Sequence, residues 1–370
     1  MRVGLLAYGL DRPLTGISRY TIELAKGLAR LKDGPELVLL RAGSLGALEG
    51  AGIASGALPG CRLLPGLMTL GNVEIPLAAA RWGLDIVHDP VGVAPFFFGA
   101  GRAKTVVTLH DVLALSSPGH SAPLENLIHR FWLPRMIRRV RAVITASSQS
   151  REDILKFLHP DPTRLTVLPY GVAGCFHPLP ADSVKLRLRE RFDITGPYIL
   201  FAGALTARKN LDRLAEAWRI LAEDFPRHEL ILAGPSRGWT IPPHRDRSAG
   251  RIRATGPVSD DDLAALYNGC EVFVFPSLYE GFGLPPLEAM ACGAPVLCSN
   301  ASSLPEVVGD AARLVDPYDA RALAAGMREL LADAGRRQAL SRRGLRHSRA
   351  FTWARNAAQT MEVYRKIVYH

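Results

Sequence analysis

Short apolar runs alternate with helical patterns along most of the chain. In the first half, runs rich in aliphatic and β-branched residues lie at 2–8, 36–41, 84–90, 103–111, 141–147 and 164–171; in the second half they lie at 197–204, 228–235, 251–256, 271–276 and 294–299. Stretches with an apolar residue every three or four positions, such as 211–225, separate most of them. The alternation predicts parallel sheets covered by helices on both faces.

A segment without periodicity divides this pattern in two. Residues 171–182 are rich in glycine and proline, and a new series of strands begins at Pro197, which is typical of a domain boundary. The 370 residues also exceed the usual size of a single core. We therefore predict an α/β fold with two Rossmann-like domains, at 1–175 and 176–350, followed by a helical segment at 351–370.

The turn after the run 271–276 is the most informative part of the chain. Pro285 and Pro286 suit the first turn of a helix that Gly293 ends. Residues 281–284 would then form a strand-to-helix turn, whose free amides and positive dipole end attract an anion. Phosphate or diphosphate is the expected occupant, and a tight turn without a ligand is the alternative.

Two glutamates flank this turn. Glu280 precedes it, and Glu288 follows after seven intervening residues, one turn into the predicted helix, where its side chain leans back toward the turn. Ligands of open α/β sheets bind at such strand ends. Two hydrogen-bond acceptors beside an anion site would suit a phosphorylated polyol.

This segment resembles the signature of retaining glycosyltransferases of family four. The pair Glu280 and Glu288, the stretch EAMACGAPV at 288–296 and the stretch SSLPEVVGDAA at 302–312 follow the family pattern. The resemblance covers most of the C-terminal half. It implies the GT-B fold, with two Rossmann-like domains facing each other across a cleft and the helix at 351–370 crossing back to the N-terminal domain.

The resemblance also implies roles for individual residues. Glu280 would face the donor sugar as a catalytic residue, and Glu288 would bind the hydroxyls of the nucleotide ribose. The donor diphosphate would be held at the turn by the backbone of Gly281, Phe282, Gly283 and Leu284. The backbone of Val258 would contact the nucleobase.

A second strand end carries two cations. Arg208 and Lys209 follow Gly203 closely, before a helix that Asn210 can cap. We predict that both are catalytic and neutralise the diphosphate, with a solvated basic turn as the alternative. Many family members carry arginine directly after this glycine, where Ala204 stands here, and Arg208 is the candidate for that duty.

Two candidates lie in the N-terminal half. Gly16, in the stretch 14–20, resembles the glycine-rich loop of the family, whose amide approaches the donor phosphate or the acceptor; an ordinary turn is the alternative, and the spacing is not GxGxxG. His110 and Asp111 end the run 103–111. The resemblance places His110 near the reactive side of the sugar as a catalytic residue oriented by Asp111, whereas a satisfied polar residue is the alternative.

We predict no metal and no cofactor beyond the donor. Asp260, Asp261 and Asp262 look like a metal-binding motif, but Ser259 is a natural N-cap and places them in the first turn of a helix, where the dipole favours acids. The five cysteines are scattered without CxxC spacing, which predicts neither disulfides nor zinc and is typical of a reducing cytoplasm. The opening apolar run is too short for a signal segment.

The net charge of +10 calls for an explanation. Residues 129–141 carry five arginines, no acids and several large apolar residues. Such a patch can sit on anionic lipid headgroups, which would place the protein at the inner face of the membrane, whereas an ordinary solvated helix is the alternative. No nucleic-acid motif accompanies the charge.

The sequence therefore predicts a metal-independent retaining glycosyltransferase with a nucleotide-diphosphate sugar donor and a saccharide or lipid-linked acceptor. The stretches LHDV at 109–112 and ARKN at 207–210 are most similar to bacterial mannosyltransferases of surface polysaccharide assembly. GDP-mannose is thus the favoured donor, with UDP-glucose and UDP-N-acetylglucosamine open. The alternatives are a sugar-nucleotide epimerase of the same architecture and a non-catalytic GT-B subunit that binds nucleotide and a partner protein.

Overall fold

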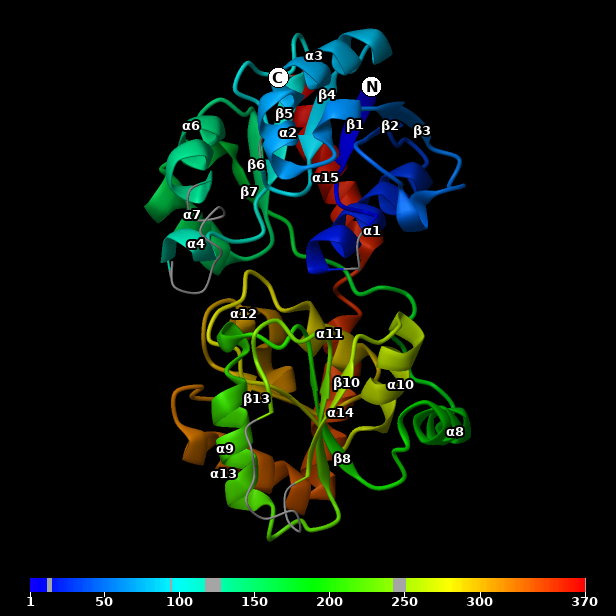
Figure 1. Cartoon of the computed structure of the whole chain (residues 1–370), viewed down its shortest axis with the longest axis vertical. Helices are drawn as coiled ribbons and strands as arrows, with labels where there is room; N and C mark the ends of the chain where they lie inside the picture. The colour runs from blue at the N-terminus through cyan, green and yellow to red at the C-terminus, as the bar shows by residue number, and fades with distance from the viewer. Residues whose placement is uncertain (12–14, 94, 117–127, 242–250, 370) are drawn as a thin grey trace. The chain divides into compact units, whose positions relative to one another are not determined.

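A computed structural model describes residues 1–11, 15–93, 95–116, 128–241 and 251–369 (Figure 1). The chain forms two compact units. Unit 1 comprises Met1–Gly171 with Thr352–His370, and unit 2 comprises Val172–Phe351. The predicted first boundary, after residue 175, lies four residues later than in the structure. The predicted second boundary, after residue 350, lies one residue earlier.

Unit 1 is built on a parallel sheet of seven strands in the order β3-β2-β1-β4-β5-β6-β7. The strands are β1 Arg2–Ala7, β2 Glu36–Arg41, β3 Ala54–Ala57, β4 Ile86–Asp89, β5 Lys104–Thr108, β6 Ala142–Thr145 and β7 Leu165–Val167. The strand order reverses between β1 and β4, which is where ligands bind in open α/β sheets. β1 and β4 to β6 are buried along nearly their whole length, as expected for strands covered on both faces.

The helices of unit 1 are α1 Gly16–Arg30, α2 Leu64–Thr69, α3 Gly71–Trp82, α4 Leu113–Ser116, α6 Leu133–Ile137, α7 Ser148–Leu158 and α15 Trp353–Tyr369. Short 3-10 or π turns lie at η1 Gly46–Leu48, η2 Pro59–Cys61, η4 Ile128–Trp132 and η5 Pro162–Arg164. A capping box begins α1, because the Thr15 hydroxyl accepts from the Ser18 amide and the Ser18 hydroxyl accepts from the Thr15 amide.

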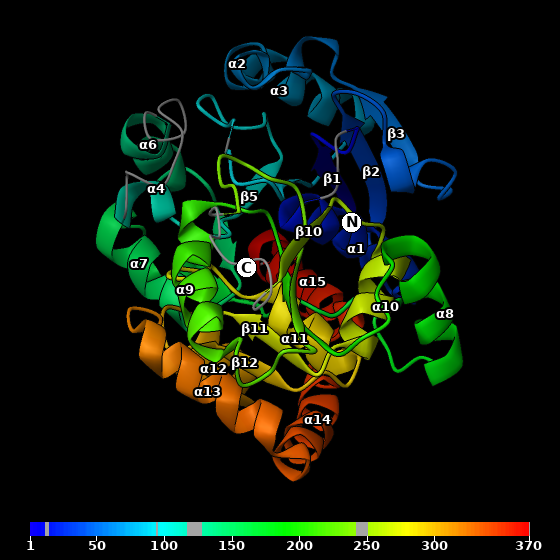
Figure 2. The same ribbon diagram turned by 60° about the horizontal axis from the view of Figure 1, so that its bottom comes forward.

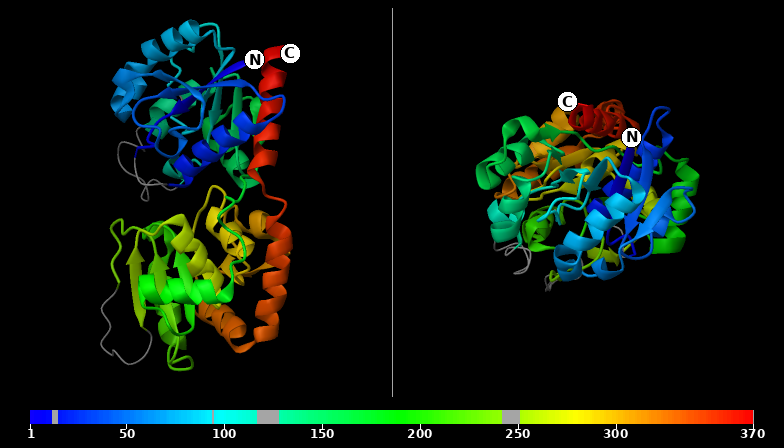
Figure 3. Two further views of the ribbon diagram at one scale, coloured as in Figure 1. Left: turned by 90° about the vertical axis from the view of Figure 1, so that its right-hand side faces the viewer. Right: turned by 90° about the horizontal axis from the view of Figure 1, so that it is seen from above.

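The C-terminal helix α15 belongs to unit 1 (Figure 3). It packs against α1, where a Cβ on Gly27 would come within 2.8 Å of the Ala357 Cβ. The Tyr364 hydroxyl lies 2.6 Å from Nδ1 of the buried His88, and the Asn356 amide donates to the Pro169 carbonyl at 2.9 Å. Close packing and buried hydrogen bonds therefore join the end of the chain to its first domain.

Unit 2 is built on a parallel sheet of six strands in the order β10-β9-β8-β11-β12-β13. The strands are β8 Tyr198–Ala202, β9 Glu229–Ala233, β10 Ile252–Gly256, β11 Val272–Phe275, β12 Val296–Ser299 and β13 Ala312–Val315. Phe201 and Phe275 stack at 5.9 Å between ring centroids, and Trp218 is fully buried. Large apolar side chains thus fill the centre of this unit.

The helices of unit 2 are α8 Ala181–Phe192, α9 Leu211–Leu221, α10 Asp260–Gly269, α11 Leu284–Ala291, α12 Leu304–Val308, α13 Ala320–Ala332 and α14 Ala334–Ser348, with short turns at η6 Ala207–Lys209 and η7 Gly309–Ala311. α9 packs with α13, α8 with α10, and α11 with α14 (Figure 2). The two parallel sheets confirm the predicted fold class of two Rossmann-like domains.

Two strands escaped the sequence pattern. β3 has the sequence ASGA, which lacks β-branched and aromatic residues, and it forms because it pairs with β2 at the sheet edge. β13 pairs with β12 at the opposite edge of the second sheet. Pairing with a neighbour overrides weak local propensity in both cases.

Candidate functional site

The carboxyl ends of β8 and β11 meet at one edge of the second sheet, because these strands are neighbours and parallel. Arg208 and Lys209 lie in η6, soon after β8, and Glu280 lies in the loop after β11. The Leu278 amide donates to the Arg208 carbonyl at 3.0 Å and ties the two loops together. The fold therefore brings together residues that are about 70 positions apart in the sequence.

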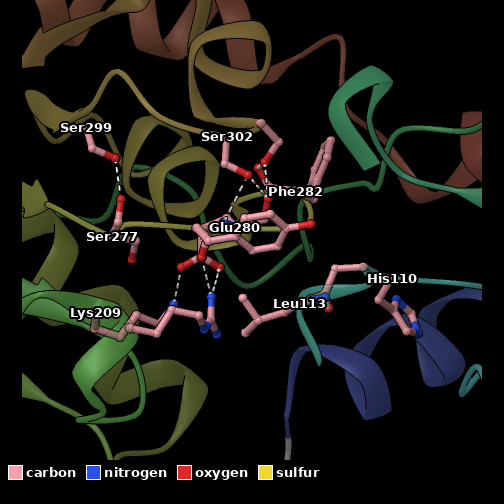
Figure 4. A network of polar contacts seen from close by, with 12 residues as sticks. His110, Leu113, Lys209, Ser277, Glu280, Phe282, Ser299 and Ser302 are labelled. Atoms are coloured by element: carbon pink, nitrogen blue, oxygen red, sulfur yellow. Dashed lines mark hydrogen bonds and ion pairs between the residues drawn. The ribbon is translucent and has the colours of Figure 1, made fainter. Parts of the chain in front are cut away.

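Both cations contact the carboxylate of Glu280 (Figure 4). Arg208 Nη1 lies 2.9 Å from Oε2, and Lys209 Nζ lies 2.5 Å from Oε1. Arg208 also donates to the Tyr279 carbonyl at 2.6 Å, and Lys209 Nζ lies 4.5 Å from the centre of the Phe275 ring. The sequence assigned these cations to a diphosphate and missed their pairing with Glu280.

The Glu280 carboxylate lies between two cationic side chains. Burial by itself raises the pKa of the Glu280 carboxyl, but Arg208 and Lys209 outweigh it and lower that pKa to about 2. Glu280 is therefore ionised at neutral pH. Because Lys209 and Glu280 are both buried, their ion pair lies in a medium that screens charge less than water does.

Two serines hold the backbone of the turn before α11. Ser302 Oγ donates to the Glu280 carbonyl at 2.7 Å, and Ser303 Oγ lies 2.8 Å from the carbonyls of both Glu280 and Phe282. The C=O and N–H of a planar trans peptide point in opposite directions. The amides of Gly281 and Gly283 therefore point away from the carbonyl oxygens that the serines hold.

Gly283 is required at the start of α11. Its φ is 112°, in the region that favours glycine. A Cβ there would also come within 2.7 Å of Leu304 Cδ2. Phe282 and Leu284 flank this glycine, which is the N-cap residue of α11. The turn predicted to hold a diphosphate is therefore the N-terminus of a helix.

Glu288 lies in α11 and is buried. Its Oε2 accepts a hydrogen bond from the Tyr267 hydroxyl at 3.3 Å. Tyr267 belongs to α10 and was not among the residues selected from the sequence. The same is true of Ser302 and Ser303, although two adjacent hydroxyl residues soon after the run 294–299 were a usable signal.

Gly203 and Asn210 lie on either side of Arg208 and Lys209 in the segment that follows β8. Gly203 has a φ of 143°, and a Cβ there would lie 3.6 Å from Lys209 Cε, so it adjoins the cation as its position suggested. Asn210 was expected to cap α9, and it does occupy the N-cap position, but its side chain makes no capping hydrogen bond. Its backbone is in the left-handed conformation, and its side-chain amide donates to the carbonyls of Pro276 and Pro317.

Val258 lies in the loop between β10 and α10. The Ser259 hydroxyl accepts from the Asp262 amide at 3.1 Å, which confirms the predicted N-cap. Asp262 is buried and pairs with Arg187 at 2.7 Å. The three aspartates thus lie in the first turn of the helix, as predicted.

His110 and Asp111 lie just after β5 in unit 1. His110 Nε2 lies 2.8 Å from the Pro90 carbonyl, which can only accept, so Nε2 carries the proton. Nδ1 then accepts from the Tyr170 hydroxyl at 2.5 Å. Burial lowers the pKa of His110 and keeps the ring neutral, against smaller opposing effects of the Pro90 carbonyl and Asp111.

The expectation that Asp111 orients this ring is wrong. Its carboxylate accepts from the Leu113 amide at 3.0 Å, and Tyr170 and Pro90 hold the imidazole instead. Gly16 is the first residue of α1, directly after the Thr15 cap, with open space where a Cβ would stand. Of the stretch that suggested Gly16, Leu14 lies outside the described residues.

Comparisons with known proteins identify glycosyltransferases over both halves of the chain. A family model described as "Glycosyl transferases group 1" matches residues 185–347, and one described as "Glycosyltransferase Family 4" matches residues 14–173. The O-antigen chain mannosyltransferase B of Escherichia coli is 33% identical over 99% of this chain and 100% of its own length. The serotype-specific mannosyltransferase WbdA of Escherichia coli is 30% identical over 77% of this chain, which spans 37% of that longer protein.

Solved structures of the same fold cover the chain nearly completely. A sucrose-phosphate synthase from Thermosynechococcus elongatus has a TM-score of 0.76 at 20% identity, over 100% of this chain and 99% of its own. Anabaena HepE, in complex with UDP and glucose, has a TM-score of 0.75 at 20% identity, over 98% of each chain. These likenesses confirm GT-B as the fold class. The chain therefore belongs to the group 1 glycosyltransferases, and within that family it resembles bacterial mannosyltransferases.

Proposed function

We propose that this enzyme is a retaining mannosyltransferase that moves mannose from GDP-mannose to a saccharide or lipid-linked acceptor. The printed names of several relatives support mannose, above all the full-length O-antigen chain mannosyltransferase B. The observation that carries the reaction type is the buried pair of Lys209 and Glu280 with the half-buried Arg208, in the loops that precede α9 and α11.

The donor would lie along the carboxyl edge of the second sheet. The turn amides of 281–284 and the cations Arg208 and Lys209 suit the diphosphate, and the Glu288 carboxylate suits the ribose hydroxyls. Val258 follows β10, which is two strands from β8. At about 4.8 Å per strand this places the loop roughly 10 Å away, far enough for its backbone to meet the nucleobase.

The reaction breaks the bond between the anomeric carbon and the diphosphate oxygen and forms a bond to the acceptor oxygen. In our proposal the acceptor attacks on the face that the nucleotide leaves, which retains configuration, and its hydroxyl proton passes to the departing phosphate oxygen. Arg208, Lys209 and the turn amides stabilise the charge that develops on the leaving group. Helix amides and two cations would serve without a metal ion or a further cofactor.

Glu280 would accept hydrogen bonds from the sugar hydroxyls while it remains ionised between its two cations. His110 would lie at the reactive side of the sugar without moving a proton, because both of its ring nitrogens are hydrogen-bonded to the protein. Gly16 and Asp111 remain candidates for the acceptor side. The basic segment 129–141 would place the enzyme at the cytoplasmic face of an anionic membrane, where a lipid-linked acceptor is presented.

Donor binding is the first test. Thermal stability of the full chain is measured with GDP-mannose, UDP-glucose and UDP-N-acetylglucosamine, because a donor at a hundred times its Kd adds about 2.7 kcal/mol of stability. We expect GDP-mannose to raise the melting temperature most. A larger shift with a UDP-sugar would refute the proposed donor, and no shift with any donor would refute donor binding.

Product analysis is the second test. The enzyme is incubated with the best donor, with and without a mannose-containing saccharide, in the presence and absence of EDTA. We expect nucleotide release that depends on the acceptor, persists in EDTA, and gives a linkage with the anomeric configuration of the donor. Acceptor-independent release with a changed free sugar nucleotide would establish the epimerase, and loss of activity in EDTA would overturn metal independence.

A further inference from the structure

The buried Tyr267 of α10 contacts a residue of the proposed donor site but has no role there so far. Its hydroxyl donates to Glu288 Oε2 at 3.3 Å. Glutamate is among the side chains that lose most rotamer freedom when they are ordered. A partner that holds the carboxylate before a ligand arrives therefore favours binding, because less ordering remains to be done.

Tyr267 reaches Glu288 from the interior of unit 2. Tyr267 lies in the last turn of α10, and Glu288 lies one turn into α11. Both helices follow a parallel strand and run back toward the amino edge of the sheet. The tyrosine has no exposed surface, whereas 4% of Glu288 is exposed. Tyr267 therefore cannot touch a ligand itself, and any effect on binding has to pass through Glu288.

The ring of Tyr267 is fixed by aromatic packing. Phe273 of β11 meets it edge-on at 5.2 Å between ring centroids, and Phe176 meets it edge-on at 5.7 Å. Such edge-to-face pairs add to the stability gained from burial alone. The direction in which the hydroxyl points is thus set by its neighbours and not by Glu288.

The backbone of α10 is anchored on both sides of Tyr267. The hydroxyl of the buried Tyr198 donates to the Leu266 carbonyl at 2.7 Å. The Asn268 side chain accepts from the Leu179 amide at 2.8 Å. These bonds tie the last turn of α10 to β8 and to the segment before α8. Tyr267 is therefore the rigid member of its pair with Glu288.

We propose that Tyr267 is a positioning residue that orients the Glu288 carboxylate for the ribose hydroxyls of the donor. A carboxylate has about four acceptor sites on its two oxygens, so one bond from Tyr267 fixes its orientation and leaves capacity for hydroxyl groups. The proposal rests on the proposed function, in which Glu288 binds the ribose. The alternative is that the carboxylate merely satisfies a buried hydroxyl.

The test is calorimetric binding of GDP and of 2′,3′-dideoxy-GDP, which lacks both ribose hydroxyls, to the full chain. Tyr267→Phe keeps the ring and its packing and removes only the hydroxyl. The matched control is Tyr198→Phe, which removes a buried hydroxyl that also bonds α10 but not Glu288. UDP and 2′,3′-dideoxy-UDP replace the guanosine pair if a UDP-sugar proves to be the better donor.

We expect the wild type and Tyr198→Phe to prefer GDP over the dideoxy compound by the same ratio. Tyr267→Phe should bind GDP about fivefold more weakly, the equivalent of one hydrogen bond, and should bind the dideoxy compound with wild-type affinity. Circular dichroism should show unchanged folding. Equal losses with both nucleotides would indicate a merely structural role and overturn the proposal, as would unchanged affinity for GDP.

A double variant tests whether Tyr267 acts through Glu288. Tyr267→Phe should cause no further loss of GDP affinity when added to Glu288→Ala, and an additional loss of the same size would overturn the proposal. Failure of the proposed function gives a different result. A wild type that binds both nucleotides equally, or neither, would refute the ribose role of Glu288 and this inference with it, whereas a preference that Tyr267→Phe retains would refute the positioning role alone.

Discussion

Glu280→Gln is the sharpest probe of the buried cluster, because glutamine has the shape of the protonated carboxylic acid and lacks its charge. The wild-type carboxyl titrates at about 2 in the folded protein against an ordinary 4.5. Each pKa unit corresponds to about 1.4 kcal/mol, so ionised Glu280 stabilises the fold by about 3 kcal/mol at neutral pH. The variant should lose that amount at pH 7.

The same shift fixes the pH dependence of this loss. The folded pKa is depressed, so the stabilisation is fully present above about pH 4.5 and disappears as the pH falls toward 2. At pH 3.5 the difference between wild type and variant should shrink to about 2 kcal/mol. Loss of other carboxylate charges at this pH weakens both proteins alike and cancels in the comparison.

Amide hydrogen exchange is the suitable assay, because a chain with two units need not unfold in one transition. Protection of peptides from β11 and α11 reports on unit 2, and peptides from β1 and α1 provide an internal control in unit 1. Glu216→Gln, on the exposed side of α9, should change protection by less than about 0.5 kcal/mol. Equal protection of wild type and Glu280→Gln at pH 7, or a gap that does not shrink with pH, would refute this electrostatic account.

Further expectations concern ligand binding and turnover. Glu288→Ala should weaken nucleotide binding, measured by calorimetry, whereas Glu280→Ala should mainly lower kcat; equal losses of affinity would break that division of roles. Lys209→Met should lower turnover by about ten- to a hundredfold, the equivalent of one charge-assisted hydrogen bond, and unchanged kcat would remove it from the reaction. Ser303→Ala should weaken binding of a nucleoside diphosphate about tenfold by releasing two carbonyls of the turn, with Ser183→Ala, whose hydroxyl bonds its own helix start, as the control.

Local patterns were sufficient for the larger architecture. Alternating strands and helices, the break near 171–182 and the glycine and proline positions around α11 each depend on residues close in sequence. Local signals predicted the Ser259 cap for the same reason, because a cap and its amide are three residues apart. They failed at β3, where pairing with β2 decides the conformation.

The chemistry of the site depended on contacts between distant segments. The sequence by itself determined the two-domain α/β class, the strand-to-helix turn before α11 and the pair Glu280 and Glu288 that flanks it. Only the tertiary structure decided that Arg208 and Lys209 pair with Glu280, that Ser302 and Ser303 hold the carbonyls of the turn, and that Tyr170 rather than Asp111 holds His110. The physical reason is that parallel strands far apart in sequence end at a common sheet edge, so which side chains meet there depends on strand order, which local periodicity does not encode.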